Sequence, residues 1–186
     1  AIANQPLEGE VEKYRVILLT LRLPRTLLMA LTGAALAGSG AAYQGLFRNP
    51  LADPYLIGAA SGAGLGAVIA MTLKLPAGSP GFMAVPLFAF LTALATVFVV
   101  YQMAKTGSTI PVTNLILAGV AVSSFATALT SFLMINASGE LRRALVWLLG
   151  GSTLAGWKPL LAQLPYTIIG LGILLAMAYR LNVLQF

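Results

Sequence analysis

The chain has 186 residues, of which 59% are hydrophobic and 9% are charged, and its net charge is +6. Soluble domains carry about 25% charged residues, so this composition predicts a membrane protein and argues against a soluble domain. The absence of cysteine and histidine excludes disulfides, thiol chemistry and the usual zinc or haem-iron ligands. The eleven basic residues are scattered, which argues against nucleic acid as a partner.

The first predicted element is a membrane helix at about residues 26–47, long enough for the roughly 20 residues that a bilayer requires. Residues 1–12 are polar, show no signal-peptide pattern, and are expected to form a loop before it. Arg22 and Arg25 flank Pro24 and are expected to mark the membrane boundary. Small residues recur at four-residue spacing in the helix, which predicts close contact with another helix: Gly33, Ala37, Ala41 and Gly45.

A polar, proline-broken turn at residues 49–54 is predicted to separate the first span from a second at about residues 55–73. Pro50 cannot continue the helix, and Asp53 before Pro54 is typical of a helix start with a capping carboxylate. We expect three polar residues to cap and bond the broken backbone of this turn: Gln44, Asn49 and Asp53. The second span carries another small-residue series, which again predicts close packing: Gly58, Gly62 and Gly66.

Three further spans are predicted at about residues 83–103, 112–135 and 160–179, the last kinked near Pro165. Residues 140–149 are too short and too charged to cross a bilayer, and their helical apolar spacing predicts an interfacial helix. The fold class expected from the sequence is therefore an all-α, polytopic helical bundle with about five transmembrane helices. We find no pattern of metal ligands, paired intramembrane carboxylates or phosphate-binding loop.

An ordered set of motifs resembles the FecCD-type permeases, the membrane subunits of ABC importers for iron chelates, haem and cobalamin. The matching segments are Arg22-Leu23-Pro24-Arg25, Gly33-Ala34-Ala35-Leu36-Ala37, Ser39-Gly40, Gln44, Asn49-Pro50-Leu51-Ala52-Asp53-Pro54, Gly58, Ser61-Gly62-Ala63, Leu115-Ile116-Leu117-Ala118-Gly119-Val120, Trp147-Leu148-Leu149-Gly150 and Arg180-Leu181-Asn182. Their order and spacing make the resemblance specific, and it covers nearly the whole chain from Arg22 onward.

The resemblance implies a fold of ten membrane helices per subunit, of which this chain would supply helices two to six. Residues 1–186 would then be a single, partial permease domain, with coupling helices expected after Phe186. The implied partners are a second permease subunit in a homodimer, ATP-binding subunits, an extracytoplasmic substrate-binding protein and the lipid bilayer. The implied location is the cytoplasmic (inner) membrane of a bacterium or archaeon, and no cofactor is implied.

The resemblance also assigns roles to particular residues, each of which has a plainer alternative. Arg22 and Arg25 would dock carboxylates of the binding protein, or would anchor the helix at lipid headgroups. The residues expected to line the translocation path, or else to pack between helices, are Gly119, Ser123, Thr127, Thr130 and Ser131. The residues expected to be interfacial anchors, or else an outer gate, are Arg142, Arg143 and Trp147.

The resulting functional hypothesis is a permease that works by alternating access and carries out no covalent chemistry itself. The alternatives are a structural or assembly membrane protein and an ion-coupled carrier. The positive-inside rule places Arg22 and Arg25 in the cytoplasm, whereas the resemblance places them outside. We follow the resemblance, because an ordered set of motifs is more specific than a count of basic residues in loops. The side with more basic residues holds Lys13, Arg15, Arg22, Arg25, Lys74, Arg142, Arg143 and Lys158, and the other holds Arg48, Lys105 and Arg180.

Overall fold

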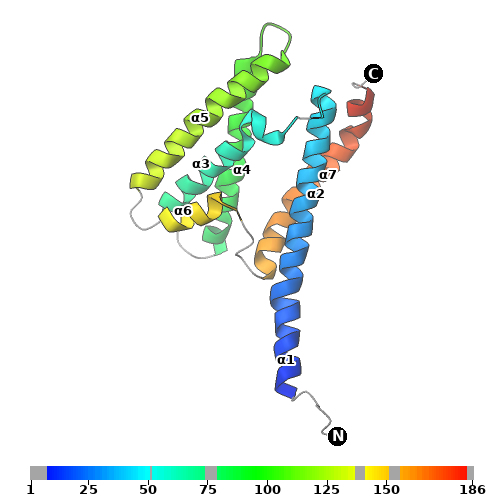
Figure 1. Cartoon of the computed structure of the whole chain (residues 1–186), viewed down its shortest axis with the longest axis vertical. Helices are drawn as coiled ribbons and strands as arrows, with labels where there is room; N and C mark the ends of the chain where they lie inside the picture. The colour runs from blue at the N-terminus through cyan, green and yellow to red at the C-terminus, as the bar shows by residue number, and fades with distance from the viewer. Residues whose placement is uncertain (1–7, 51, 74–78, 137–140, 151–155, 184–186) are drawn as a thin grey trace. The chain divides into compact units, whose positions relative to one another are not determined.

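The computed structural model describes residues 8–50, 52–73, 79–136, 141–150 and 156–183, and within these ranges the fold is helical (Figure 1). The elements are α1 (Glu8–Val16), the π-helix η1 (Ile17–Arg22), α2 (Leu23–Phe47), the 3₁₀-helix η2 (Pro54–Ile57), α3 (Ala59–Thr72), α4 (Ser79–Ala104), α5 (Val112–Asn136), α6 (Leu141–Leu148) and α7 (Trp157–Val183). The chain divides into two compact units: unit 1 comprises Ala1–Ala42 with Ser152–Phe186, and unit 2 comprises Tyr43–Gly151.

Four helical stretches among the described residues are long and apolar enough to cross a membrane: Glu10–Phe47, Ala84–Ala104, Val112–Asn136 and Trp157–Arg180. Each contains or closely matches one of the spans expected from the sequence. The expected span at 55–73 differs, because it consists of the short helix η2 followed by α3, which has 14 residues. A helix of that length extends about 21 Å, less than the roughly 30 Å hydrocarbon core of a bilayer.

Unit 1 contains an uninterrupted helical run through α1, η1 and α2, where the sequence predicted a loop followed by a boundary at Arg22 and Arg25. The expectation of a loop is wrong from Glu8 onward, since α1 begins at that residue; residues 1–7 lie outside the described residues. Glutamate and lysine are good helix formers, and Glu12 pairs with Arg15 one turn later at 3.9 Å. The polar composition of this segment therefore did not distinguish a solvated loop from a solvated helix.

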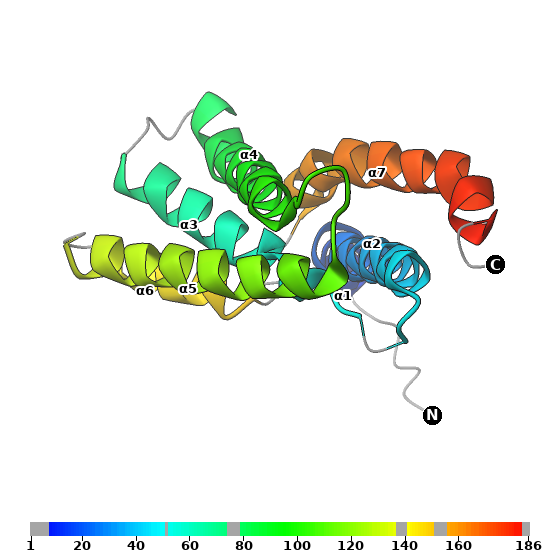
Figure 2. The same ribbon diagram turned by 90° about the horizontal axis from the view of Figure 1, so that it is seen from above.

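In unit 2, helix α3 lies between α4 and α5, as the view in Figure 2 shows. The residues of α3 that are buried are Gly62, Gly64, Gly66, Ala67, Val68, Ala70 and Met71. One apolar cluster contains Ile57, Val100, Ala104 and Ala118, and a second contains Val68, Met71 and Ala144. The short helix α6 is attached to unit 2 through this second cluster, and Figure 1 labels it beside the lower end of α3.

Candidate functional site

The turn after α2 closes the helix with a backbone motif that normally requires glycine. The Asn49 N–H donates to the Gln44 carbonyl at 3.2 Å, and the Arg48 N–H donates to the Gly45 carbonyl at 3.3 Å. This pair of bonds is the Schellman arrangement, and Arg48 takes the left-handed conformation within it, with φ of 49°. Main-chain atoms of Gln44 and Asn49 therefore bond the backbone at this turn, and the capping role expected of their side chains stays a prediction.

Asp53 caps the next helical turn as the sequence predicts. Its Oδ1 accepts a hydrogen bond from the Tyr55 N–H at 2.8 Å, and Pro54 occupies the first helical position of η2. Gly58 then adopts a φ of +80°, which ends η2 and starts α3. A side chain at Gly58 would be strained by that φ and would also approach Thr96 and Ser123.

The second small-residue series brings α3 against α4 at backbone distance. A Cβ atom added at Gly62 would meet the Thr96 side chain and, at 2.9 Å, the Thr92 carbonyl oxygen. A Cβ atom added at Gly66 would meet Thr92 and the carbonyl of Phe88. These glycines therefore have the close-packing role that the sequence assigned to them.

The first small-residue series is different, because Gly33, Ala37 and Ala41 are exposed in this chain. A Cβ atom added at Gly33 would have no neighbour within 4 Å. Only Gly45, the last member of the series, is buried. The same four-residue spacing of small residues thus marks a packed face in α3 and a largely exposed face in α2.

The residues expected to line a translocation path occupy two environments on α5. Gly119 and Thr130 are buried within unit 2, and Ser123 is half-buried with its Oγ near Gly58. Gly119 packs against the Leu56 carbonyl and the Ile57 Cα of η2. For Gly119 the structure therefore shows a helix-packing contact.

Thr127 and Ser131 are exposed, and the exposed Ser124 lies on the same helical face, three residues before Thr127. We call Ser124, Thr127 and Ser131 the hydroxyl stripe. The sequence analysis missed Ser124, although its spacing from Thr127 could have identified it. Each hydroxyl of the stripe donates to its own helix, to the carbonyls of Val120, Ser123 and Thr127, at 2.8, 2.8 and 3.0 Å respectively. In this state the stripe offers oxygen lone pairs and no free donor.

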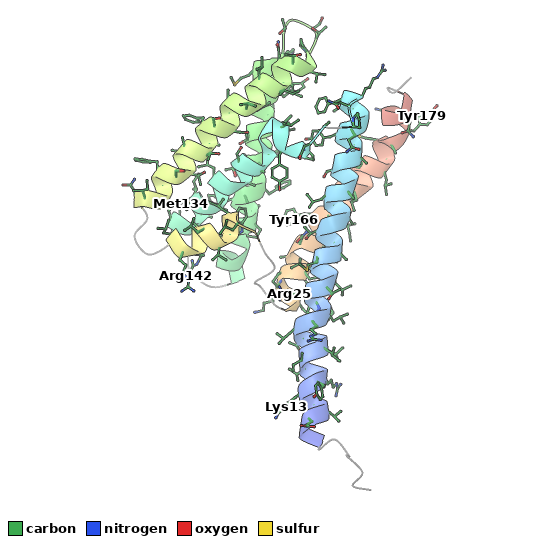
Figure 3. The ribbon with its side chains drawn as sticks, in the orientation of Figure 1. Lys13, Arg25, Met134, Arg142, Tyr166 and Tyr179 are labelled. Carbon is green, nitrogen blue, oxygen red and sulfur yellow. The ribbon has the colours of Figure 1, made fainter. Side chains whose placement is uncertain are left out.

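Arg22 and Arg25 are both exposed in unit 1, at the junction of η1 and α2. Figure 3 labels Arg25 on this helix. The arginines lie within a continuous helix, since α1 and η1 precede them and α2 follows. A pair of exposed guanidinium groups on a helix can bind carboxylates or phosphates, each in a bidentate manner.

Helix α6 (Leu141–Leu148) closely matches residues 140–149, the range predicted for an interfacial helix. Ala144 is buried against α3, and the Leu148 side chain would be 2.9 Å from a Cβ atom added at Gly64. Arg142, Arg143 and Trp147 are exposed, and Figure 3 shows Arg142 on α6. The amphipathic pattern of α6 thus turns its small residue inward and its arginines outward.

Two contacts between α7 and the α1–α2 helix were not predicted from the sequence. The Trp157 Nε1–H donates to the Leu19 carbonyl at 3.1 Å, and Gln163 Nε2 donates to Thr32 Oγ1 at 3.0 Å. The sequence separations of 138 and 131 residues explain why no local pattern indicated them. The described residues contain no group of three His, Cys, Asp or Glu side chains that could hold a metal ion.

Long apolar helices and a glycine-packed core define the class of the protein. It is a polytopic, all-helical membrane protein. Residues 2–186 match the FecCD transport family, and the chain belongs to that family.

Individual relatives agree with this assignment. The chain is 44% identical over 176 residues to the cobalamin import system permease protein BtuC of Halobacterium salinarum, a match covering 95% of this chain and 47% of the relative. It is 38% identical over 184 residues to the hemin transport system permease protein HmuU of Yersinia pestis, covering 91% of this chain and 51% of the relative.

A solved structure of a metal-chelate type ABC transporter in an inward-facing conformation matches with a TM-score of 0.79 and 30% identity. The match covers 95% of this chain and 55% of the solved chain. This chain thus spans about half the length of the curated relatives that it matches.

Proposed function

We propose that this chain is part of the membrane-spanning permease subunit of a binding-protein-dependent ABC importer that carries an iron chelate, haem or cobalamin. Membership of the FecCD transport family over residues 2–186 is the observation that carries this proposal. The names of the relatives, a cobalamin import permease and a hemin transport permease, support the cargo class. They favour transport over a purely structural membrane protein or an ion-coupled carrier.

In this proposal the permease itself performs no covalent chemistry. Separate subunits bind and hydrolyse ATP, a substrate-binding protein delivers the cargo outside the membrane, and a second permease subunit, in a homodimer, completes the path. The assembly is located in the cytoplasmic membrane, where it works by alternating access. The single permease domain over residues 1–186, with spans near 26–47, 55–73, 83–103, 112–135 and 160–179, belongs to the same proposal.

The hydroxyl stripe is the surface of unit 2 that we propose for the translocation path. Its members are exposed and uncharged, and their hydroxyl hydrogens are already donated within α5. Such a surface would give a bulky cargo weak contacts and no strong ionic partner, which suits passage better than tight binding. Gly119 and Thr130, which were also expected in the path, are buried within unit 2 and so lie outside this exposed surface.

Uptake by cells that lack the gene for the intact permease tests the function directly. We expect such cells to lose uptake of one cargo among radiolabelled cobalamin, haem and a ferric siderophore, and to recover it when the gene is restored. Unchanged uptake of all three would contradict the proposed function.

The hydroxyl stripe can be tested in the same cells. Thr127→Leu combined with Ser131→Leu should reduce uptake severalfold while leaving the amount and melting temperature of the purified protein near those of the parent. Phe125→Leu, at an exposed apolar position of the same helix, serves as the matched control and should transport normally. Normal uptake by the double variant would remove the stripe from the path.

A further inference from the structure

Pro24 lies inside a continuous helical run, and this is the unusual feature of unit 1. Proline has no N–H, and its ring clashes with the carbonyl four residues earlier, so it normally ends or kinks a helix. Here the preceding turn is the π-helix η1, in which the Leu23 N–H donates to the Leu18 carbonyl, five residues back. Pro24 itself is fully buried, whereas Leu23 and Arg25 on either side of it are exposed.

The π register leaves one backbone acceptor without a helical donor. In an α-helix the Leu19 carbonyl would accept from the Leu23 N–H, but that group donates to Leu18. In the π register its partner would be the nitrogen of Pro24, which carries no hydrogen. The carbonyl of Leu19 must therefore find a donor outside its own helix or remain unsatisfied.

Trp157, the first residue of α7, supplies that donor. Its Nε1–H donates to the Leu19 carbonyl at 3.1 Å. An indole has a single N–H group and accepts no hydrogen bond, so the contact matches a lone carbonyl. The indole of Trp157 thus supplies the hydrogen-bond donor that the Leu19 carbonyl lacks because of Pro24.

We propose that η1, Pro24 and Trp157 form a latched hinge: the indole bond fixes the angle between η1 and α2, and its release allows the Glu8–Arg22 segment to bend relative to α2. Helices bend preferentially at prolines, at π turns and where side chains bond to freed carbonyls, and all three coincide here. The first turn of α7 therefore controls the direction of the helix that carries Arg22. This inference depends on contacts within unit 1 and does not rest on the proposed transport function.

The latch can be tested by NMR of the intact permease labelled with ¹⁵N-tryptophan. The indole peak that disappears in Trp157→Phe identifies Trp157, and in the parent its hydrogen should exchange slowly with deuterium. Pro24→Ala restores a backbone donor, so we expect Trp157 indole exchange to accelerate about tenfold or more. Pro86→Ala, at a proline inside α4, is the matched control and should leave that exchange unchanged. Unchanged exchange in Pro24→Ala would overturn the latch.

The hinge can be tested by the distance between two spin labels. This sequence contains no cysteine, so cysteines at the exposed positions Tyr14 and Leu36 are the only thiols in it. Any cysteine elsewhere in the intact permease is first replaced by serine. The labels are separated by 22 residues of helix, and we expect one narrow distance near 33 Å in the parent. Trp157→Phe should broaden that distribution, whereas Trp147→Phe, at the other tryptophan, should not.

A variant that removes the defect keeps the test decisive if Trp157→Phe misfolds. In Pro24→Ala combined with Trp157→Phe the helix has all its donors, so the distance distribution should stay narrow. A distribution that stays narrow in Trp157→Phe alone would refute the hinge. A distribution that broadens equally with and without Pro24 would refute the role of the proline.

Discussion

At the scale of single residues, the glycines divide into those that touch another backbone and those that face open space. Gly62 and Gly33 have similar sequence surroundings, and both were expected to pack. The structure shows a close neighbour for a Cβ atom at Gly62 and none at Gly33. The sequence indicates which residues permit close approach, but whether another helix approaches is determined by the tertiary fold.

Gly62→Ala and Gly33→Ala form a matched pair for measuring this difference. Both substitutions gain about 1 kcal/mol of helix propensity, so the difference between them reports packing. Gly62→Ala should lose about 1–3 kcal/mol by overpacking against Thr92 and Thr96, and Gly62→Leu should lose more. Thermal unfolding of the intact protein in detergent measures both. If Gly62→Leu melts like the parent, α3 does not pack on α4 through this glycine.

Local backbone chemistry was predictable where the partners are close in sequence. The Asp53 cap and Pro54 at the first helical position follow from residue type and order, and both are present. The left-handed Arg48 was not predicted, because glycine is the residue usually found there. The Trp157–Leu19 bond was also missed, since it depends on a backbone acceptor that no sequence pattern marks.

At the scale of elements, prolines in this chain lie both at the starts of helices and inside them, and the sequence indicated only some of these positions. Pro54 starts a helix as expected, Pro86 lies unnoticed inside α4, and Pro24 lies inside a helix that was expected to begin just after it. In the π turn before Pro24 the Leu23 N–H donates to the carbonyl five residues back, and the helix continues through the proline. Whether a proline terminates a helix depends on whether a donor is available to the freed carbonyl.

The crossing of α5 over η2 should be intolerant of any side chain at Gly119. Its added Cβ atom would meet the Leu56 carbonyl and, at 3.1 Å, the Ile57 Cα, which are backbone atoms that cannot rotate away. Gly119→Ala should therefore lower stability by about 1–3 kcal/mol. Gly172→Ala in α7, where a Cβ atom has no neighbour within 4 Å, should be neutral or slightly stabilising when measured in the same melt. Equal melting of the two variants would contradict the crossing.

The polar contact between α2 and α7 should contribute a measurable coupling. Gln163 donates to Thr32, whose hydroxyl donates in turn to the Leu28 carbonyl at 2.8 Å. A double-mutant cycle with Gln163→Leu and Thr32→Val should give a coupling of about 0.6 kcal/mol, the average for such bonds in membrane helices. Steric trapping in detergent measures the free energy of unfolding of the parent, the two single variants and the double variant. A coupling of zero would mean that the bond contributes nothing to stability.

At the scale of the whole molecule, the sequence predicted the fold class well and the surface roles only as hypotheses. Hydropathy identifies long helices such as α4 and α5 because lipid exposure demands apolar residues over a fixed length. No equivalent rule identifies a docking surface. Arginine at a helix junction suits a protein carboxylate and a lipid phosphate equally well, so Arg22 and Arg25 need a binding measurement.

Charge reversal at Arg22 and Arg25 tests the proposed docking to an acidic binding protein. Arg22→Glu with Arg25→Glu should weaken docking strongly and remove most of its salt dependence, because charged contacts are screened over roughly 8 Å at physiological salt. Both side chains are exposed, so the variant should still fold. Lysine substitutions in the binding protein should partly restore the affinity in a pull-down. If the residues only anchor the helix in lipid, stability will change and docking will not.

The orientation of Arg22 and Arg25 in the membrane can be tested at the neighbouring residue Thr26. A single cysteine at the exposed Thr26 should react with a membrane-impermeant thiol reagent added outside intact cells. Reaction only from the cytoplasmic side would support the positive-inside count and would exclude contact between these arginines and an external partner.

The shortness of α3 also determines how the molecule responds to lipid. A helix of about 21 Å cannot set the hydrophobic thickness of its surroundings, so lipids of different chain length act on α4 and α5. Helix α4 contacts α3 at Gly62 and Gly66, and α5 contacts the preceding helix η2 at Gly119. A change in bilayer thickness would therefore act on α3 only through these contacts, where backbone lies against backbone and little adjustment by side chains is available.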